Sequence, residues 1–299
     1  MRMDASESLR IPSGKKVDLK TCDPKWIPKW ARHCDKKTVK KEALEILENN
    51  KQTLMARQEL LWASDTYALL VVLQGMDAAG KDSVIRHVMS GVNPQGCQVT
   101  SFKTPSTEEL DHNFLWRHMK ALPERGRIGI FNRSYYEDVL VVRVHPEWLA
   151  RQKLPSEQVG KNFWNHRYED INAFEQHLVR NGVVVLKFFL HMSKEKQRQR
   201  LLKRLEDPKK HWKFSVSDLA ERGKWNDYIK AYEDMLSRTS TEWAPWYTIP
   251  ADRRWVTLAS ASEILVDQIE KLNLHYPKPD ETALKKARQQ LEEEKEQLK

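Results

Sequence analysis

Short apolar runs alternate with amphipathic stretches through the middle of the chain. Five of these runs are rich in β-forming residues and predict buried strands, at 67–73, 99–102, 127–131, 183–192 and 255–258. Helical periodicity predicts the intervening helices, over 38–64, from 81 onward, and over 108–122, 163–181, 194–206, 224–242 and 261–272. Strands that alternate with helices indicate an α/β fold, with a parallel sheet and helices on both of its faces.

The two ends of the chain differ from this middle part. Residues 1–37 are polar with scattered prolines and predict an N-terminal arm, in which Trp26 and Trp30 would pin a short helix onto the body. Residues 38–277 are expected to form one domain, and the nearly all-charged residues 278–299 a helix or tail. A solvated helix is favoured there over a coiled-coil seam. The seam would rest on leucines at seven-residue spacing, Leu284, Leu291 and Leu298.

Composition narrows the class of protein. The 299 residues are 40% hydrophobic and include 11 Trp, which favours a packed core over disorder. No apolar run approaches the roughly 20 residues that span a bilayer, and the N-terminus lacks the core of a signal peptide, so a cytoplasmic location is expected. Three scattered cysteines without a C-x-x-C pair suit a reducing compartment and argue against structural zinc. The net charge of +9 favours polyanionic partners.

A glycine-rich turn follows the first predicted strand. In LLVVLQGMDAAGKDSVIRHVMSG, Gly75, Gly80 and Lys81 have the G-x-x-x-x-G-K spacing of a phosphate-binding loop. Glycines let successive N–H groups point at phosphate oxygens, and the next helix adds its positive N-terminal end. Lys81 would supply a charge for a bridging phosphate. The strand before the turn and the helix after it favour this function over a chance glycine turn.

This loop carries two acids that would repel phosphate. Asp82 stands where Ser or Thr usually helps to hold magnesium, and Asp77 lies inside the loop. A carboxylate beside phosphate is tolerated when a divalent cation lies between them, so Asp77 is interpreted as a metal ligand. For Asp82, metal binding and favourable placement at the helix N-terminus remain equally open. The missing hydroxyl indicates a donor arrangement unlike that of most nucleoside triphosphatases.

A second polar cluster follows the third predicted strand, in the stretch RIGIFNRSYYED. Asn132 ends the strand, where α/β proteins open onto a ligand crevice. Arg133 can neutralise charge on a transferring phosphoryl group. Glu137 and Asp138 are candidate metal-directed acids. The alternative is a surface ion network, but the phosphate loop before this strand favours the functional interpretation.

A basic segment follows the fourth predicted strand. Residues 194–213 contain nine Lys or Arg against three acids, and Lys196, Arg200, Lys203 and Arg204 share one helical face. An isolated helix of this kind would usually be a solvated basic face. After the fourth strand of a phosphate-loop fold, residues 194–215 are instead expected to form a lid over the transferring phosphates.

Five stretches in this order resemble the polyphosphate kinase 2 family. They are GMDAAGKD, FKTPSTEELDHNFLWR, FNRSYYEDVLVVRV, HMSKEKQRQRLLKRLEDPKKHWKF and APWYTIPADRRW, and the resemblance covers residues 38–272. FNRSYYED looks like the subgroup that accepts both nucleoside mono- and diphosphates. Other subgroups have Asp where this chain has Asn132, and lack the acid at Glu137, so their metal site does not transfer simply.

The resemblance implies a P-loop kinase fold similar to thymidylate kinase, with three α/β/α layers, a five-stranded parallel sheet and a helical lid. The donor would be inorganic polyphosphate and the acceptors AMP and ADP, or GMP and GDP, with Mg²⁺ as cofactor and Mn²⁺ as a substitute. A homo-oligomer, dimer or tetramer, is expected, without nucleic-acid or membrane partners. Catalytic roles would fall to Asp77, Lys81, Arg133 and Glu137, and metal binding to Asp77, Glu137 and Asp138. Polyphosphate would contact Gly75, Ala78, Ala79, Gly80, Lys81, Asp82, Ser83, Arg200, Lys203 and Arg204. The nucleotide would contact Asp77, Phe102, Lys103, His112, Asn113, Arg117, Asn132, Arg133, Tyr136, Glu137 and Arg143.

Two other functions compete with this one. An ATP-dependent kinase for a nucleotide or small molecule fits the loop, but the absent Ser or Thr after Lys81 and the basic lid argue against it. A basic nucleic-acid-binding protein fits the net charge, but the sequence has no zinc-finger, RNA-recognition or helix-turn-helix signature. Phe102 or Phe114 could stack on a base, although a core position is commoner for an aromatic residue.

Overall fold

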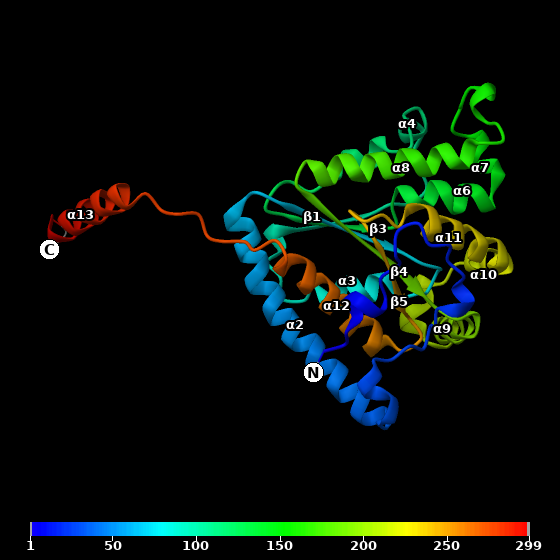
Figure 1. The fold of residues 1–299 in the computed structure, drawn as a ribbon, viewed down its shortest axis with the longest axis horizontal. Helices are drawn as coiled ribbons and strands as arrows, with labels where there is room; N and C mark the ends of the chain where they lie inside the picture. The colour runs from blue at the N-terminus through cyan, green and yellow to red at the C-terminus, as the bar shows by residue number, and fades with distance from the viewer. Residues whose placement is uncertain (1, 298–299) are drawn as a thin grey trace.

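The structure, a computed structural model, describes residues 2–297 and is built around one parallel sheet (Figure 1). The strands lie in the order β2-β3-β1-β4-β5, and all neighbouring pairs are parallel. Their bounds are β1 Ala68–Gln74, β2 Cys97–Ser101, β3 Ile128–Asn132, β4 Val183–His191 and β5 Trp246–Pro250. The predicted α/β class and five-stranded parallel sheet are confirmed.

Helices cover both faces of the sheet and make three layers (Figure 1). One face packs on α2 (Lys36–Ser64), α3 (Lys81–Val88) and α12 (Arg254–Glu270). The other packs on α8 (Phe163–Arg180) and α11 (Trp225–Thr239). The remaining helices are α1 Ala5–Ser8, α4 Thr107–Leu110, α5 Trp116–Met119, α6 Val141–Val144, α7 Pro146–Ala150, α9 Lys194–Glu206, α10 Val216–Gly223 and α13 Glu281–Gln297.

The apolar runs of the sequence explain these layers. In β1, Leu69, Val71 and Leu73 pack toward α2 and α12, while Leu70 and Val72 pack toward α8 and α11. Because both faces of a parallel sheet are covered, its central strands are apolar at nearly every position. The carboxyl ends of these strands meet at one edge, where the loops after β1 and β3 lie side by side.

The predicted fifth strand and one predicted helix are wrong. Residues 255–258 lie in the first turns of α12, and the fifth strand is β5, nine residues earlier in the chain. Two features that usually mark a helix are absent here. In the described part of the chain, α12 has no exposed face from Val256 to Val266, and its N-cap residue Arg253 makes no side-chain capping bond. The helix expected over 108–122 is interrupted, and only the single-turn helices α4 and α5 form there.

The N-terminal arm packs into the body of the protein. Met3 and Ala5 are fully buried, and their backbone N–H groups donate to the Glu263 carboxylate at 2.6 and 2.9 Å. Trp26 and Trp30 also pack against the core, with Trp30 in a 3₁₀ turn over Lys29–His33. The arm therefore contributes to the same hydrophobic core as α2 and α12.

The C-terminal helix α13 projects away from the body on an extended segment (Figure 1). Leu284 and Leu291 are exposed, and Leu298 lies outside the described residues. The choice between a solvated helix and a coiled-coil seam stays a prediction. In the part of the chain that the structure describes, no helix has the length and apolar character needed to cross a membrane.

A buried ion pair fastens the segment after β3 to the core. Lys187 in β4 is fully buried, and its Nζ donates to Glu175 Oε2 at 2.6 Å and to the Tyr136 hydroxyl at 3.0 Å. The hydroxyls of Tyr135 and Tyr136 donate to Glu175 Oε1 at 2.8 and 2.7 Å. Burial lowers the pKa of Lys187 and raises the pKa of both tyrosines. This network fixes the 3₁₀ turn Tyr135–Val139 in place.

We expect Lys187→Met to lower the free energy of unfolding by roughly 3–5 kcal/mol, because it leaves the Glu175 carboxylate buried without its cation. Urea denaturation measures this change. The matched control is Lys230→Met, at an exposed position on α11, which should shift the free energy by less than about 0.5 kcal/mol. Equal stabilities of the two variants would contradict a structural role for the buried pair.

Candidate active site

The loop between β1 and α3 turns at two glycines. Gly75 has φ 148° and Gly80 has φ 113°, a region that favours glycine. A Cβ on Gly75 would lie 2.8 Å from the Leu190 backbone oxygen, so β4 leaves no room for a side chain there. Gly80 directly precedes the first turn of α3. The loop therefore has the strand–turn–helix setting that a phosphate-binding loop requires.

Lys81 closes back over this loop. Its Nζ donates to the Gly75 oxygen at 2.6 Å and to the Met76 oxygen at 3.3 Å. Burial, and then the nearby Arg133 charge, lower the pKa of Lys81, while Asp77 and Glu137 act in the opposite direction. The charges of all three other predicted catalytic side chains therefore act on the Lys81 ammonium group.

Arg133 lies between two carboxylates at the end of β3. Its guanidinium is 2.7 Å from Asp77 Oδ1 and 3.6 Å from Glu137 Oε2. These acids raise the pKa of Arg133, with Glu137 the larger cause. The backbone φ of Arg133 is 64°, an uncommon conformation for a non-glycine residue that is typical of functional sites. The structure therefore brings together Asp77, Lys81, Arg133 and Glu137, from the loop after β1 and the segment after β3.

Asn132 and Asp82 join the same two segments. Asn132 Nδ2 donates to Asp82 Oδ1 at 2.9 Å and to Ser101 Oγ at 3.4 Å. Asp82 lies in the first turn of α3, where a negative charge is favoured by the helix dipole. This contact ties Asp82 to β3 but does not decide between its two predicted roles.

Helix α9 supports the loop from the other side. Arg200 Nη1 donates to the Ala78 and Ala79 oxygens, each at 2.8 Å. Arg204 is bound to Asp218 of α10 at 3.0 Å, whereas Lys203 is exposed. Arg254, at the start of α12, donates to Ser83 Oγ at 3.0 Å. Sequence reasoning missed Arg254, although the ADRRW stretch gave a signal in its paired arginines.

We expect Arg200→Met and Lys203→Met to change different kinetic parameters. Arg200→Met removes the donors that hold the loop carbonyls, so kcat should fall by at least about tenfold. Lys203→Met removes only an exposed charge, so it should raise the KM for polyphosphate and flatten its salt dependence. Initial rates at several salt concentrations distinguish these effects. Identical kinetic profiles would contradict the division between loop support and chain binding.

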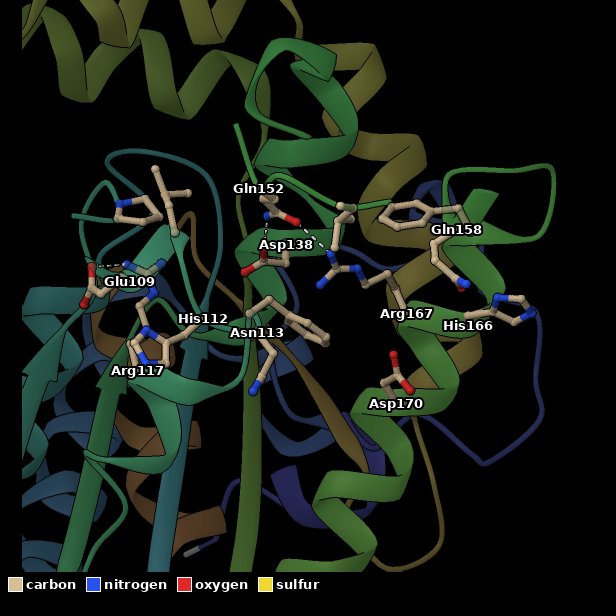
Figure 2. Close-up of a pocket in the computed structure, with 15 residues that line it drawn as sticks. Glu109, His112, Asn113, Arg117, Asp138, Gln152, Gln158, His166, Arg167 and Asp170 are labelled. Atoms are coloured by element: carbon tan, nitrogen blue, oxygen red, sulfur yellow. Dashed lines mark hydrogen bonds and ion pairs between the residues drawn. The ribbon is translucent and has the colours of Figure 1, made fainter. Parts of the chain in front are cut away.

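Two adjoining clefts open beside Arg133. The larger, of about 280 Å³, lies between the loop around α4 and helix α8 (Figure 2). The smaller, of about 90 Å³, includes Arg133 and Glu137 in its wall. Predicted nucleotide-binding residues line one or both clefts, namely Phe102, Lys103, His112, Asn113 and Arg117. Phe102 also packs on Phe131 in the core, at 4.9 Å between ring centroids.

Three sequence predictions fit this geometry poorly. Tyr136 is fully buried in the Lys187 network, so its side chain supports the site from below and does not face a nucleotide. Arg143 binds Asp234 at 2.6 Å and the Tyr168 hydroxyl at 2.9 Å, outside the walls of both clefts. Asp138 accepts from Gln152 Nε2 at 2.6 Å, and burial raises its pKa to about 6.

The carboxylates of the site are better suited to a metal ion that is held jointly by the protein and substrate phosphates than to one held by protein side chains alone. Within residues 2–297, no three His, Cys, Asp or Glu side chains form a group that could hold a metal. Mg²⁺ commonly uses one or two carboxylates together with substrate phosphates. Asp77 and Glu137, which approach the same guanidinium, fit that donor set. Asp138 fits that donor set less well, because it is buried on the far side of Glu137 from the P-loop contact and one of its oxygens already accepts from Gln152.

A family model for polyphosphate kinase 2 matches residues 36–277, most of the chain. The chain belongs to the polyphosphate kinase 2 family. It is 50% identical over 274 residues to an ADP-polyphosphate phosphotransferase of Rhodopseudomonas palustris, covering 91% of this chain and 92% of the relative. It is 48% identical over 247 residues to an AMP/ADP-polyphosphate phosphotransferase of Meiothermus ruber, covering 83% and 88%.

A solved polyphosphate kinase 2 agrees with this assignment. The crystal structure of the Arthrobacter aurescens enzyme has a TM-score of 0.83 and 38% identity to this chain, over 95% of this chain and 98% of that one. Family members have a P-loop kinase fold, so the loop between β1 and α3 is the P-loop of this protein.

Proposed function

We propose that this protein transfers the terminal phosphoryl group of inorganic polyphosphate to nucleoside mono- and diphosphates. The observation that carries the proposal is Arg133, which contacts Asp77 of the P-loop and also lines the cleft beside it. The positively charged Arg133 side chain thus borders both the phosphate-binding loop and a candidate acceptor site. The relatives from Rhodopseudomonas palustris and Meiothermus ruber have names that state this type of reaction.

The residues suggest an in-line transfer. The donor end would lie against the P-loop backbone and Lys81, and the acceptor phosphate against Arg133. Positioning and charge stabilisation supply most of the catalysis in phosphoryl transfer. Mg²⁺, or Mn²⁺ in its place, would neutralise the phosphate oxygens between Asp77 and Glu137. Because donor and product are both phosphoanhydrides, the reaction would be reversible. A homo-oligomer and a cytoplasmic location stay predictions.

An ATP-dependent kinase is the second candidate. The specific observation for it is the P-loop itself, which binds nucleoside triphosphates in many proteins. Asp82 at the position of the usual magnesium-binding hydroxyl argues against it.

Product analysis distinguishes the two. The protein is incubated with Mg²⁺ and AMP, ADP or GDP, with either polyphosphate or ATP as donor, and the nucleotides are separated by chromatography. Polyphosphate-dependent formation of the next higher phosphate is expected. Transfer with ATP and none with polyphosphate would overturn the proposal.

We expect Glu137→Gln to reduce phosphorylation of AMP more than that of ADP. A monophosphate ends one phosphate short, so its reacting oxygen reaches the in-line position only if metal or water fills the gap. The Glu137 carboxylate, 3.6 Å from Arg133, could hold that filling cation. The ratio of kcat/KM for AMP to that for ADP should fall by about tenfold. Equal losses for both acceptors would leave Glu137 as a general partner of Arg133.

A further inference from the structure

Three side chains form a hydrogen-bonded row along the wall of the larger cleft. Arg167 Nη2 donates to Gln152 Oε1 at 2.6 Å, and Gln152 Nε2 donates to Asp138 Oδ1 at 2.6 Å (Figure 2). Arg167 lies on α8, Gln152 in the loop after α7, and Asp138 in the 3₁₀ turn after β3. Only the fold brings these residues together.

This row has unused hydrogen-bonding capacity. Arg167 is 6% exposed, and its Nη1 is buried without a partner in the described part of the chain. Asp138 is 7% exposed and accepts its side-chain bond from Gln152 through Oδ1, which leaves Oδ2 for another donor. Buried polar atoms without partners are rare and costly in proteins. The row therefore presents an unpaired donor and an available acceptor close to one another.

The row of Asp138, Gln152 and Arg167 runs from the smaller cleft into the larger one. Arg133 and Glu137 line only the smaller cleft, and Arg167 lines only the larger one. Asp138 and Gln152 line both. An acceptor whose phosphate lies at Arg133 would therefore place its ribose in the smaller cleft and its base in the larger.

The larger cleft also has aromatic walls suited to a base. The Arg167 guanidinium lies over the rings of Phe114 and Phe163, at 4.0 and 5.0 Å from their centroids. Planar bases stack favourably on aromatic rings and on guanidinium planes. Phe114 was considered for this role from the sequence, but Gln152 and Arg167 were not, because no local motif marks them.

We propose that this row recognises the adenine base of the acceptor. Asp138 Oδ2 accepts from the 6-amino group, and Arg167 Nη1, after turning toward the cleft, donates to ring nitrogen N1 or N7. Gln152 is a positioning residue that fixes the other two. The inference rests on the proposed nucleotide acceptor, and it assigns Asp138 to base recognition instead of metal binding.

Calorimetry on the full-length protein, without polyphosphate, tests the inference. Binding of ADP is compared with binding of purine riboside 5′-diphosphate, which lacks the 6-amino group. The parent protein should bind ADP about tenfold more tightly than the analogue, because the analogue cannot form the charge-assisted hydrogen bond between the 6-amino group and Asp138. In Asp138→Asn the preference for ADP should shrink to about twofold or less. The oxygen of the new asparagine should keep accepting from Gln152, so its NH₂ group would face the 6-amino group of adenine, and two donors cannot bond to each other.

The control and a second variant keep the test decisive. Glu169→Gln removes an exposed carboxylate on α8 outside both clefts and should keep the parent's preference. If Asp138→Asn does not fold, the binding of 1-deaza-ADP and 7-deaza-ADP is compared with that of ADP in the parent and in Arg167→Met. The parent should bind one of these analogues more weakly than ADP, and Arg167→Met should bind that analogue and ADP equally well. Equal weakening of ADP and the analogue, or no preference in the parent, would overturn the inference. Parallel assays of the parent with polyphosphate show separately whether the proposed function fails.

Discussion

Replacing Lys81 with Ala is expected to lower the rate of phosphoryl transfer by on the order of 10² or more, because a positive charge beside the developing phosphate charge is lost. Within residues 2–297 the ammonium group bonds only to two carbonyls of its own loop, at 2.6 and 3.3 Å. These bonds are readily exchanged for phosphate oxygens, so the side chain is available to the donor. Single-turnover rates with polyphosphate and ADP measure the effect without interference from product release.

The loop itself should survive this substitution. Gly75 and Gly80 set the backbone path, and Arg200 holds the Ala78 and Ala79 oxygens independently of Lys81. The circular-dichroism melting curve of Lys81→Ala should therefore overlay that of the parent. A natively folded variant that keeps most of the parent's rate would contradict the assignment of the donor site to this loop.

The sequence predicted the core of the fold because its signals were local. The run at 67–73 and the turn at Gly75 and Gly80 identified β1 and the P-loop, and the basic segment identified α9. The fifth strand was misplaced because α12 is buried on nearly all sides from Val256 to Val266 and has no exposed face there to set its period. Burial from several directions depends on the whole fold, so no window of sequence carries it.

The same distinction holds for the site. Asp77, Lys81, Arg133 and Glu137 belong to two short motifs, and the parallel pairing of β1 with β3 brings the motifs together. Arg167 was missed because it reaches the larger cleft from α8, outside any motif. The burial of Tyr136, which was predicted to contact the nucleotide, could not be foreseen because it depends on Lys187 in another strand.

The acids of the P-loop have structural partners that the sequence did not show. Asp77 Oδ1 accepts from Arg133 at 2.7 Å, and the Asp77 backbone oxygen accepts from Gln197 of α9 at 3.0 Å. Asp82 accepts from Asn132 at 2.9 Å. These contacts connect the loop to β3 and α9, the two elements that border the proposed acceptor and donor phosphates. The acids therefore organise the loop even before any cation binds.

Two roles for Asp77 follow from this geometry, and Asp77→Asn distinguishes them. The amide keeps an oxygen that can accept from Arg133 but loses the negative charge that a divalent cation needs. If Asp77 binds the metal, kcat should fall by on the order of 10² or more, and half-maximal activity should require more Mg²⁺. If Asp77 only orients Arg133, most of the activity and the original Mg²⁺ dependence should remain. We expect the first outcome, since the acid lies inside a loop built for anions and needs a cation to be compatible with them.

Metal binding can be measured apart from activity. Free Mn²⁺ has a sharp electron paramagnetic resonance spectrum that broadens when the ion is bound. Titration with Mn²⁺ at an ADP concentration that saturates each variant, compared with a protein-free ADP blank, therefore reports the affinity of the protein–ADP complex for Mn²⁺. Asp77→Asn should weaken this binding, whereas Asp138→Asn should not, because Asp138 is turned toward Gln152. Asp138→Asn is the same chemical change close to Glu137, and saturating ADP offsets the weaker nucleotide binding that the proposed base contact predicts for this variant. Loss of Mn²⁺ binding in Asp138→Asn with retention in Asp77→Asn would reverse the assignment and place the metal in the acceptor cleft.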